Sequence, residues 1–243
     1  MEPTPSMQKR NNILILLAFS LSALIGFALL TVAVWGDIEA SMFSMSQNGE
    51  KRLGTLSCPV LITPQDEAEF TAKFHNPIER VIEPSVRVHI SSGQLTFKQE
   101  DNYRFELAPN ETRKLAWPVN PEDAVYGKMV LVKVYLFRHN PIPSQDATCG
   151  ILVLDLPTVT GKQVVYGSSG LSFLGMIGTV GLWKKNNRLM TRKQTEAFRS
   201  MAILAGSIIL GLGASLLGYW LIGSLGLMIA VLLTVAAITQ SFK

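Results

Sequence analysis

The side chains that could carry out chemistry in this chain are few, and their spacing does not build a reaction centre. The three histidines, His75, His89 and His139, show no ligand spacing, whereas a metal site needs three or four converging ligands. Two of them fall on the predicted solvent faces of strands. The acidic pairs at 66–67 and 100–101 lie at predicted turns and lack the spaced Asp/Asn loop of a calcium site. Neither a Ser/His/Asp order nor a phosphate-binding glycine loop is present, so we expect no enzyme, no metal and no cofactor.

The two cysteines could instead form a structural bond. Cys58 opens a β-like segment and Cys149 begins its last apolar run, so the first and last strands could lie side by side and be bridged. We expect this segment to face an oxidising compartment, which favours a disulfide. Closing so long a loop stabilises the folded state by about 4–5 kcal/mol in the chain-entropy model. Two buried free thiols are the alternative.

The segment 58–157 consists of short runs in which apolar and polar residues alternate, the period of half-buried strands. The alternating runs are 67–75, 85–91, 102–108, 114–119 and 129–138. Turn residues such as Asn, Pro and Gly separate them, and no helical pattern intervenes. The pattern predicts an antiparallel β-sandwich of about seven strands, because two sheets must bury their apolar faces against each other.

Two turns of this domain have distinctive sequences. The first run is Phe74-His75-Asn76-Pro77 leading to Val86-Arg87-Val88, and the second is Leu107-Ala108-Pro109-Asn110-Glu111-Thr112 before an alternating strand. Both resemble turns of the Ig-like modules of bacterial cell-surface proteins, of the CARDB kind, which implies an Ig-like sandwich. Asn110 stands where that pattern usually has Gly, and Asn is the next residue most tolerant of a positive φ. The resemblance covers the middle of the domain and implies the fold rather than a site.

The same turn contains a candidate modification site. Asn110-Glu111-Thr112 is an acceptor for N-linked sugar in a eukaryotic secretory pathway. The predicted turn would expose Asn110, so the source organism decides whether a sugar is attached.

Long apolar stretches without charge flank the β domain. Residues 13–35 are enough to cross a hydrocarbon core of about 30 Å, and a cleaved signal peptide, the alternative, would have a shorter apolar region. Residues 36–57 are expected to be a linker, with a short interfacial helix as an option. A second span is expected at 164–183. The apolar stretch after 201 has room for two spans, 201–219 and 221–240, so the expected fold is a four-span α-helical bundle carrying the β-sandwich outside the membrane.

Lysine and arginine predict the orientation. In the tail 1–12, the segment 184–200 and Lys243 together, nine Lys and Arg outnumber two acids, whereas 36–165 has thirteen Lys and Arg against sixteen acids. We therefore expect 184–200 to be a basic cytoplasmic loop. Its cations are Lys184, Lys185, Arg188, Arg192, Lys193 and Arg199. Both termini are then cytoplasmic, the β domain is extracytoplasmic, and the plasma membrane is the expected location. Despite the net charge of +4 we expect no nucleic acid as a partner, but anionic lipid headgroups at the basic loop.

Small residues recur every three or four positions in the last three spans, a pattern that lets two helix backbones approach closely in lipid. These positions are Ser172, Gly175 and Thr179, then Ser207, Gly211 and Ser215, then Gly226, Ala230 and Thr234. The first span, rich in Leu and Ile, is expected to lack such a stripe. The pattern predicts that spans two to four form a compact bundle or pack against other integral membrane subunits.

Three classes of function fit this organisation. Because the predicted spans contain no ionisable residue, a self-sufficient transporter is disfavoured. We prefer a non-enzymatic accessory or scaffold subunit that presents an Ig-like binding domain. The first alternative is a permease-like, force-transmitting subunit of an ABC-type export system, in which 184–199 should form a coupling helix. The second is a four-span adhesion protein similar in topology to claudins, although the claudin W-x-x-W signature is absent.

Overall fold

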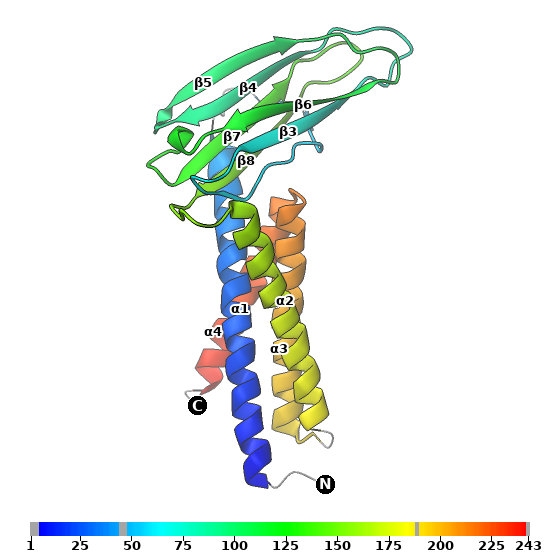
Figure 1. Cartoon of the computed structure of the whole chain (residues 1–243). Helices are drawn as coiled ribbons and strands as arrows, with labels where there is room; N and C mark the ends of the chain where they lie inside the picture. Colours follow the sequence, from blue (N-terminus) through cyan, green and yellow to red (C-terminus); the bar gives the residue numbers. More distant parts are fainter. Residues whose placement is uncertain (1–4, 44–47, 188–189, 242–243) are drawn as a thin grey trace. The chain divides into compact units, whose positions relative to one another are not determined.

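The computed structural model describes residues 5–43, 48–187 and 190–241 (Figure 1). The chain divides into two compact units. One, the helical unit, consists of residues 1–32 and 165–243, and the other, the β unit, consists of residues 33–164.

The apolar stretches form four long helices, each longer than the predicted span. They are α1 (Pro5–Met42), α2 (Gly161–Asn186), α3 (Arg192–Leu216) and α4 (Trp220–Ser241). The expected linker 36–57 is therefore wrong in its first part, because α1 continues to Met42. The expected loop 184–200 is also wrong: Lys184 and Lys185 end α2, while Arg192 begins α3.

Three of these helices are long and apolar enough to cross a membrane, namely the stretches Gln8–Met42, Gly161–Asn186 and Arg192–Leu216. The described apolar part of α4, Trp220–Ala236, is shorter. The predicted division of the last apolar stretch into two helices is confirmed, although α3 already ends at Leu216. Gly218 lies between the two helices and has a positive φ of 80° that favours glycine.

The described residues of the β unit form two sheets (Figure 1). Its elements are β1 (Lys51–Arg52), β2 (Leu61–Ile62), β3 (Ala68–His75), β4 (Ser85–Ser92), β5 (Gln94–Arg104), β6 (Thr112–Val119), a 3-10 turn at Pro121–Asp123, β7 (Met129–Leu136) and β8 (Gln145–Val153). The larger sheet has the order β1-β8-β7-β4-β5 with β2 also on β8, and the smaller pairs β3 with β6. The purely antiparallel expectation is wrong, because β1 and β2 run parallel to β8. No tight hairpin connects them to β8, so no turn imposes the opposite direction.

The alternating run predicted at 102–108 is only partly a strand. β5 ends at Arg104 after pairing with β4, and Leu107 makes an isolated bridge to Ile82. Leu107 is nevertheless fully buried. The alternation was therefore a correct sign of burial but not of a continuous strand.

The core of the β unit lies between the two sheets. Phe70 of β3 stacks on Trp117 of β6, with ring centroids 5.2 Å apart, and both rings are buried. The inward face of β7 supplies Val130, Val132 and Val134 to the same cluster. The alternation predicted for the runs 67–75 and 114–119 is thus confirmed, because β3 and β6 each turn alternate residues into this core.

The outer face of the larger sheet is also covered, by the end of α1 that belongs to the β unit. Ala40 and Phe43 pack with Met129 and Leu131 in a second cluster. Gly36 and Gly150 touch so closely that a Cβ atom on Gly150 would overlap the backbone of Gly36. This cover makes β7 buried on both faces, a state that alternation alone does not reveal.

A lysine is buried under this cover. Lys133 of β7 is 2% exposed, and its ammonium lies 3.5 Å from the Asp146 carboxylate and donates to the Asn48 side chain at 3.2 Å. A buried charge needs such partners.

Candidate functional site

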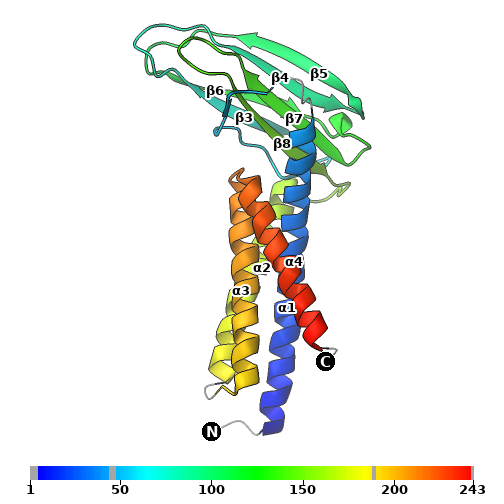
Figure 2. The same ribbon diagram turned by 180° about the vertical axis from the view of Figure 1, so that it is seen from behind.

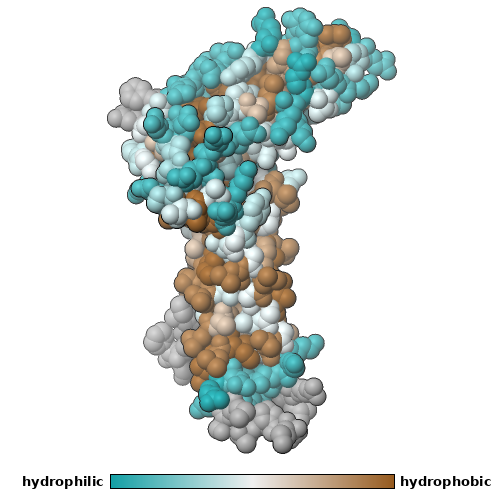
Figure 3. Space-filling view, in the orientation of Figure 1, coloured by the Kyte–Doolittle hydropathy of each residue, from teal (hydrophilic) through white to brown (hydrophobic). Residues whose placement is uncertain are grey.

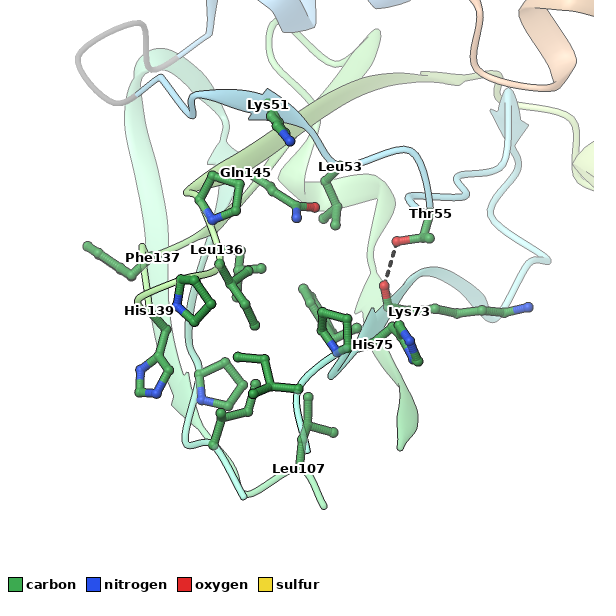
Figure 4. Close-up of a pocket in the computed structure, with 18 of the residues that line it drawn as sticks. Lys51, Leu53, Thr55, Lys73, His75, Leu107, Leu136, Phe137, His139 and Gln145 are labelled. Carbon is green, nitrogen blue, oxygen red and sulfur yellow. Dashed lines mark hydrogen bonds between the residues drawn. The ribbon is translucent and has the colours of Figure 1, made fainter. Parts of the chain in front are cut away.

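The β unit contains an open pocket of about 440 Å³, within the size range of small-molecule sites. Four separate parts of the chain form its walls: 51–55, 73–84, Leu107, and 136–145 (Figure 4). Prolines and aliphatic side chains make up most of the lining, including Pro77, Ile78, Pro141 and Ile142. The arrangement is suited to holding an apolar group.

Asn76 holds together the two turns that resemble CARDB modules. It is fully buried, and its amide nitrogen donates to the carbonyls of Arg80 at 2.8 Å, Ala108 at 2.9 Å and Leu107 at 3.1 Å. Its amide oxygen accepts from the Ile78 N–H at 3.0 Å. The Asn-Pro turn and the Leu-Ala-Pro turn are therefore one hydrogen-bonded corner, which forms a wall of the pocket.

The second of these turns is closed by its own residues. The Glu111 carboxylate accepts the Ala108 N–H at 2.7 Å, and Asn110 has the positive φ of 57° that its position requires. Asn110 is exposed, as the candidate glycosylation site would need to be. Sequence motifs that we interpreted as turn chemistry thus also position a cavity.

The charged residues that line the pocket are of one sign. They are Lys51 and Lys73, and none of the lining residues is acidic. Within the described residues, neither Lys51 nor Lys73 has a carboxylate within 4.0 Å. Figure 4 shows the Lys51 side chain directed toward the pocket and the Lys73 side chain directed away from it. An apolar partner group with a nearby acid would be complementary to this pocket.

The histidines do not converge on a ligand. His75 lies 3.0 Å from the Thr112 hydroxyl, and the described residues hold no cluster of three or more His, Cys, Asp or Glu that could bind a metal ion. His89 is not on a solvent face, because it is 1% exposed, with Nε2 3.1 Å from Glu100 Oε2. Burial, followed by the charge of Lys98, lowers the pKa of His89.

The predicted disulfide is present. Cys58 is bonded to Cys149 of β8 across a sequence separation of 91 residues, so the alternative of two free thiols is wrong. The bond anchors the segment between β1 and β2 to the last strand.

The predicted small residues lie at several helix contacts of the helical unit. A Cβ atom built on Gly226 would lie 2.9 Å from both Gly211 Cα and the Ser207 carbonyl oxygen. In Figures 1 and 2, α3 and α4 lie side by side accordingly. Ser172 of α2 is fully buried and donates to the Ser22 carbonyl of α1 at 2.9 Å.

The expectation that the first span lacks a stripe of small residues is wrong. A methyl group on Gly175 would overlap the Ser22 hydroxyl, and one on Gly26 would overlap the Ser172 hydroxyl. The signal could have been found in the sequence, since Ser22 and Gly26 are small residues four positions apart.

The remaining predicted helix positions differ in exposure. Thr179 and Ser215 are each 6% exposed, and Ala230 is fully buried, whereas Thr234 is exposed. The hydroxyls of Thr179 and Thr234 bond to carbonyls of their own helices, Gly175 and Ala230 respectively.

The predicted basic residues do not gather into a separate loop or helix. Lys184 and Lys185 are exposed at the end of α2, and Arg192, Lys193 and Arg199 lie in the first turns of α3. Arg188 lies outside the described residues. Between Lys184 and Arg199, the described residues therefore show no coupling helix of the kind that the ABC-type alternative requires.

Asp66 binds the first residue of α2. Its carboxylate accepts the N–H of Gly161 at 2.7 Å, the N–H of Thr63 at 2.8 Å and the Thr63 hydroxyl at 3.0 Å. Burial opposes ionisation, but these hydrogen bonds outweigh it and hold the pKa of Asp66 below its ordinary value of 3.8. Thr160 and Gln163 complete the helix start as a reciprocal capping box.

We expect Asp66→Asn to lower the free energy of unfolding by about 1 kcal/mol at pH 7, the usual scale for a carboxylate at a helix start. Because the folded pKa is depressed, this stabilisation is present above the ordinary value of 3.8 and is lost as the pH falls through the lower folded value. Thermal unfolding of both proteins between pH 7 and pH 3 measures it. Glu67→Gln, which removes an exposed charge at the next residue, is the control. A wild-type advantage that persists at the lowest pH would contradict this role.

Comparisons with known proteins assign no family to the chain. No family model matches it, and no curated protein matches it. Among solved structures, it is similar to the CARDB domain of a Pyrococcus furiosus protein, in a crystal structure with di-metal ions, at 17% identity over 41% of this chain and 84% of that chain, with a TM-score of 0.31. A solution NMR structure of that domain matches at 17% identity over 41% of this chain and 90% of that chain, with a TM-score of 0.30. These structures are of the same kind of module that the two turns resemble.

Proposed function

We propose that this chain is a non-enzymatic accessory or scaffold subunit of the membrane, presenting its β unit outside as a binding module. The observation that carries the proposal is the apolar pocket, whose lining contains no acidic residue and which has Lys51 at its edge. Among the described residues, no carboxylate lies within 4.0 Å of this lysine. Such a pocket is suited to holding an apolar group of a partner.

The surface of the helical unit supports the membrane part of the proposal. Leucines distributed over α1 to α4 are highly exposed, among them Leu24 at 64%, Leu174 at 76%, Leu210 at 72% and Leu221 at 65%. Figure 3 shows apolar side chains covering much of the visible face of the helices. A soluble protein rarely exposes apolar surface on this scale, so lipid or other membrane subunits should cover it.

The proposed partner is another integral membrane subunit that inserts an apolar side chain, flanked by an acid, into the pocket. We expect the Lys51→Glu variant to lose this partner, because an added acid at the edge repels the acid that the wild type attracts. Lys128→Glu makes the same change at an exposed lysine outside the pocket and should retain it.

The test is purification of tagged wild type and both variants from native membranes in mild detergent, followed by mass spectrometry. Stoichiometric membrane proteins present with wild type and Lys128→Glu, but absent with Lys51→Glu, would support the proposal. An ATPase among them would favour the export-system alternative instead. A chain that purifies without any stoichiometric partner would overturn the accessory role.

A further inference from the structure

The helical unit has a shallow groove of about 410 Å³ between α1 and α2. Its lining residues are Asn11, Leu14 and Ile15 of α1, with Leu182, Lys185 and Asn186 of α2. In each helix the polar lining residues lie three to four positions closer to the helix end than the apolar ones. The start of α1 lies beside the end of α2. The polar lining residues of both helices therefore lie at one end of the groove, and the apolar lining residues lie at the other end.

A network of side-chain amides fixes the walls of this groove. Asn12 donates to the Asn187 side chain at 3.0 Å and accepts from Asn186 at 2.8 Å, while Gln8 donates to the Asn186 carbonyl at 3.1 Å. Gln194 of α3 also donates to Asn187 at 2.9 Å, and Asn187 is 1% exposed. A mutually satisfied, partly buried network of this kind favours one register between helices. The groove is therefore a preformed feature.

The charge beside the groove is positive and available. Within the described residues, neither Lys184 nor Lys185 has a carboxylate within 4.0 Å, and the nearby Glu196 is paired with Arg192 at 3.1 Å. Basic pockets between membrane helices are suited to the headgroups of anionic lipids. A polar, cationic end and an apolar end in one groove match a headgroup and an acyl chain.

We propose that this groove binds one anionic phospholipid, with the phosphate beside Lys185 and Asn11 and an acyl chain along Leu14 and Leu182. The inference rests on the proposed membrane location. The sequence alone predicts only a general attraction between the basic residues and anionic lipid. The groove narrows this to one site, because Lys185 lines it and the neighbouring Lys184 does not.

The full chain in nonionic detergent, titrated with phosphatidylglycerol or with phosphatidylcholine of the same acyl chains, tests the proposal by native mass spectrometry. We expect one phosphatidylglycerol to be retained in preference to phosphatidylcholine. Lys185→Gln should weaken retention about fivefold, the scale for one lysine near an anionic headgroup. Lys184→Gln removes the same charge outside the groove and should change little. Leu182→Trp, which fills the apolar end and keeps every charge, should also weaken retention.

Equal retention of the two lipids, or equal losses from Lys184→Gln and Lys185→Gln, would overturn the groove as a specific site. Displacement of the lipid by water-soluble glycerol phosphate would also overturn it, because the site would then recognise phosphate without a chain. Alkaline carbonate extraction of native membranes separates this failure from that of the proposed function. A chain released into the soluble fraction overturns the membrane location, whereas a membrane-retained chain with an unselective groove overturns only the lipid site.

Discussion

The Gly211→Leu variant is expected to unfold at a clearly lower temperature than the wild type, with a loss of about 2–3 kcal/mol in the free energy of unfolding. A Cβ atom at this position already lies 3.3 Å from Gly226 Cα and 3.1 Å from a Leu30 methyl carbon. The larger leucine side chain would enter space occupied by the backbone of α4. Because backbone cannot rotate away as a side chain can, α3 and α4 must separate.

Gly213→Leu is the matched control, since a Cβ atom on Gly213 has nothing within 4 Å. It should change stability by no more than about 0.5 kcal/mol, as at other open sites. Thermal unfolding in mild detergent, with hydrogen exchange of α4 as a local readout, measures both variants. Similar losses from the two substitutions would show that the Gly211–Gly226 contact does not hold these helices together.

The Asn76→Asp variant is expected to destabilise the β unit by about 3–5 kcal/mol. The substitution keeps the shape but removes both donors of the amide, so a carboxylate oxygen faces the Leu107 and Ala108 carbonyls that the amide now binds. Buried polar groups without partners cost about 1–3 kcal/mol each, and more where one is charged. Such a loss is a large fraction of the stability of a typical domain.

Hydrogen exchange of β3 and of the Leu107–Thr112 turn is the most direct measurement, together with the thermal unfolding temperature. Asn110→Asp is the control, because Asn110 is exposed and Asp also tolerates its positive φ. The pocket should lose its partner in the Asn76 variant, because the corner that Asn76 holds forms one wall. Normal hydrogen-exchange protection in Asn76→Asp would contradict the prediction that Asn76 holds this wall of the pocket in place.

The two units are held together by different kinds of contact. In the helical unit, glycine and serine contacts such as Gly26 with Ser172 let backbones approach, and the surface stays apolar. In the β unit, the disulfide and the Asn76 corner hold turns around a cavity. Under the proposed function, the first unit would serve lateral packing and the second would bind a partner group.

The helix starts show how much more could have been taken from the sequence. Thr160-Gly161-Lys162-Gln163 and Thr191-Arg192-Lys193-Gln194 are both capping boxes, and in each the Thr and Gln exchange hydrogen bonds with backbone N–H groups. From these two motifs, the first residues of α2 and α3 could have been predicted correctly. Hydropathy alone placed the starts later, because the first turn of each helix is polar.

The amino-acid sequence by itself determined the strands with a regular period, the helices with their break at Gly218, and the cysteine pair. Each of these depends on neighbours along the chain or on the only two thiols available. Only the tertiary structure decided the parallel pairing of β1 and β2 with β8, the cover of the sheet by the end of α1, and the pocket. A periodic pattern reports which side of an element is buried, but not which distant element buries it. Which distant element covers a face depends on long-range contacts such as that of Gly36 with Gly150. In the sequence, such a contact is visible only as two glycines far apart in the chain.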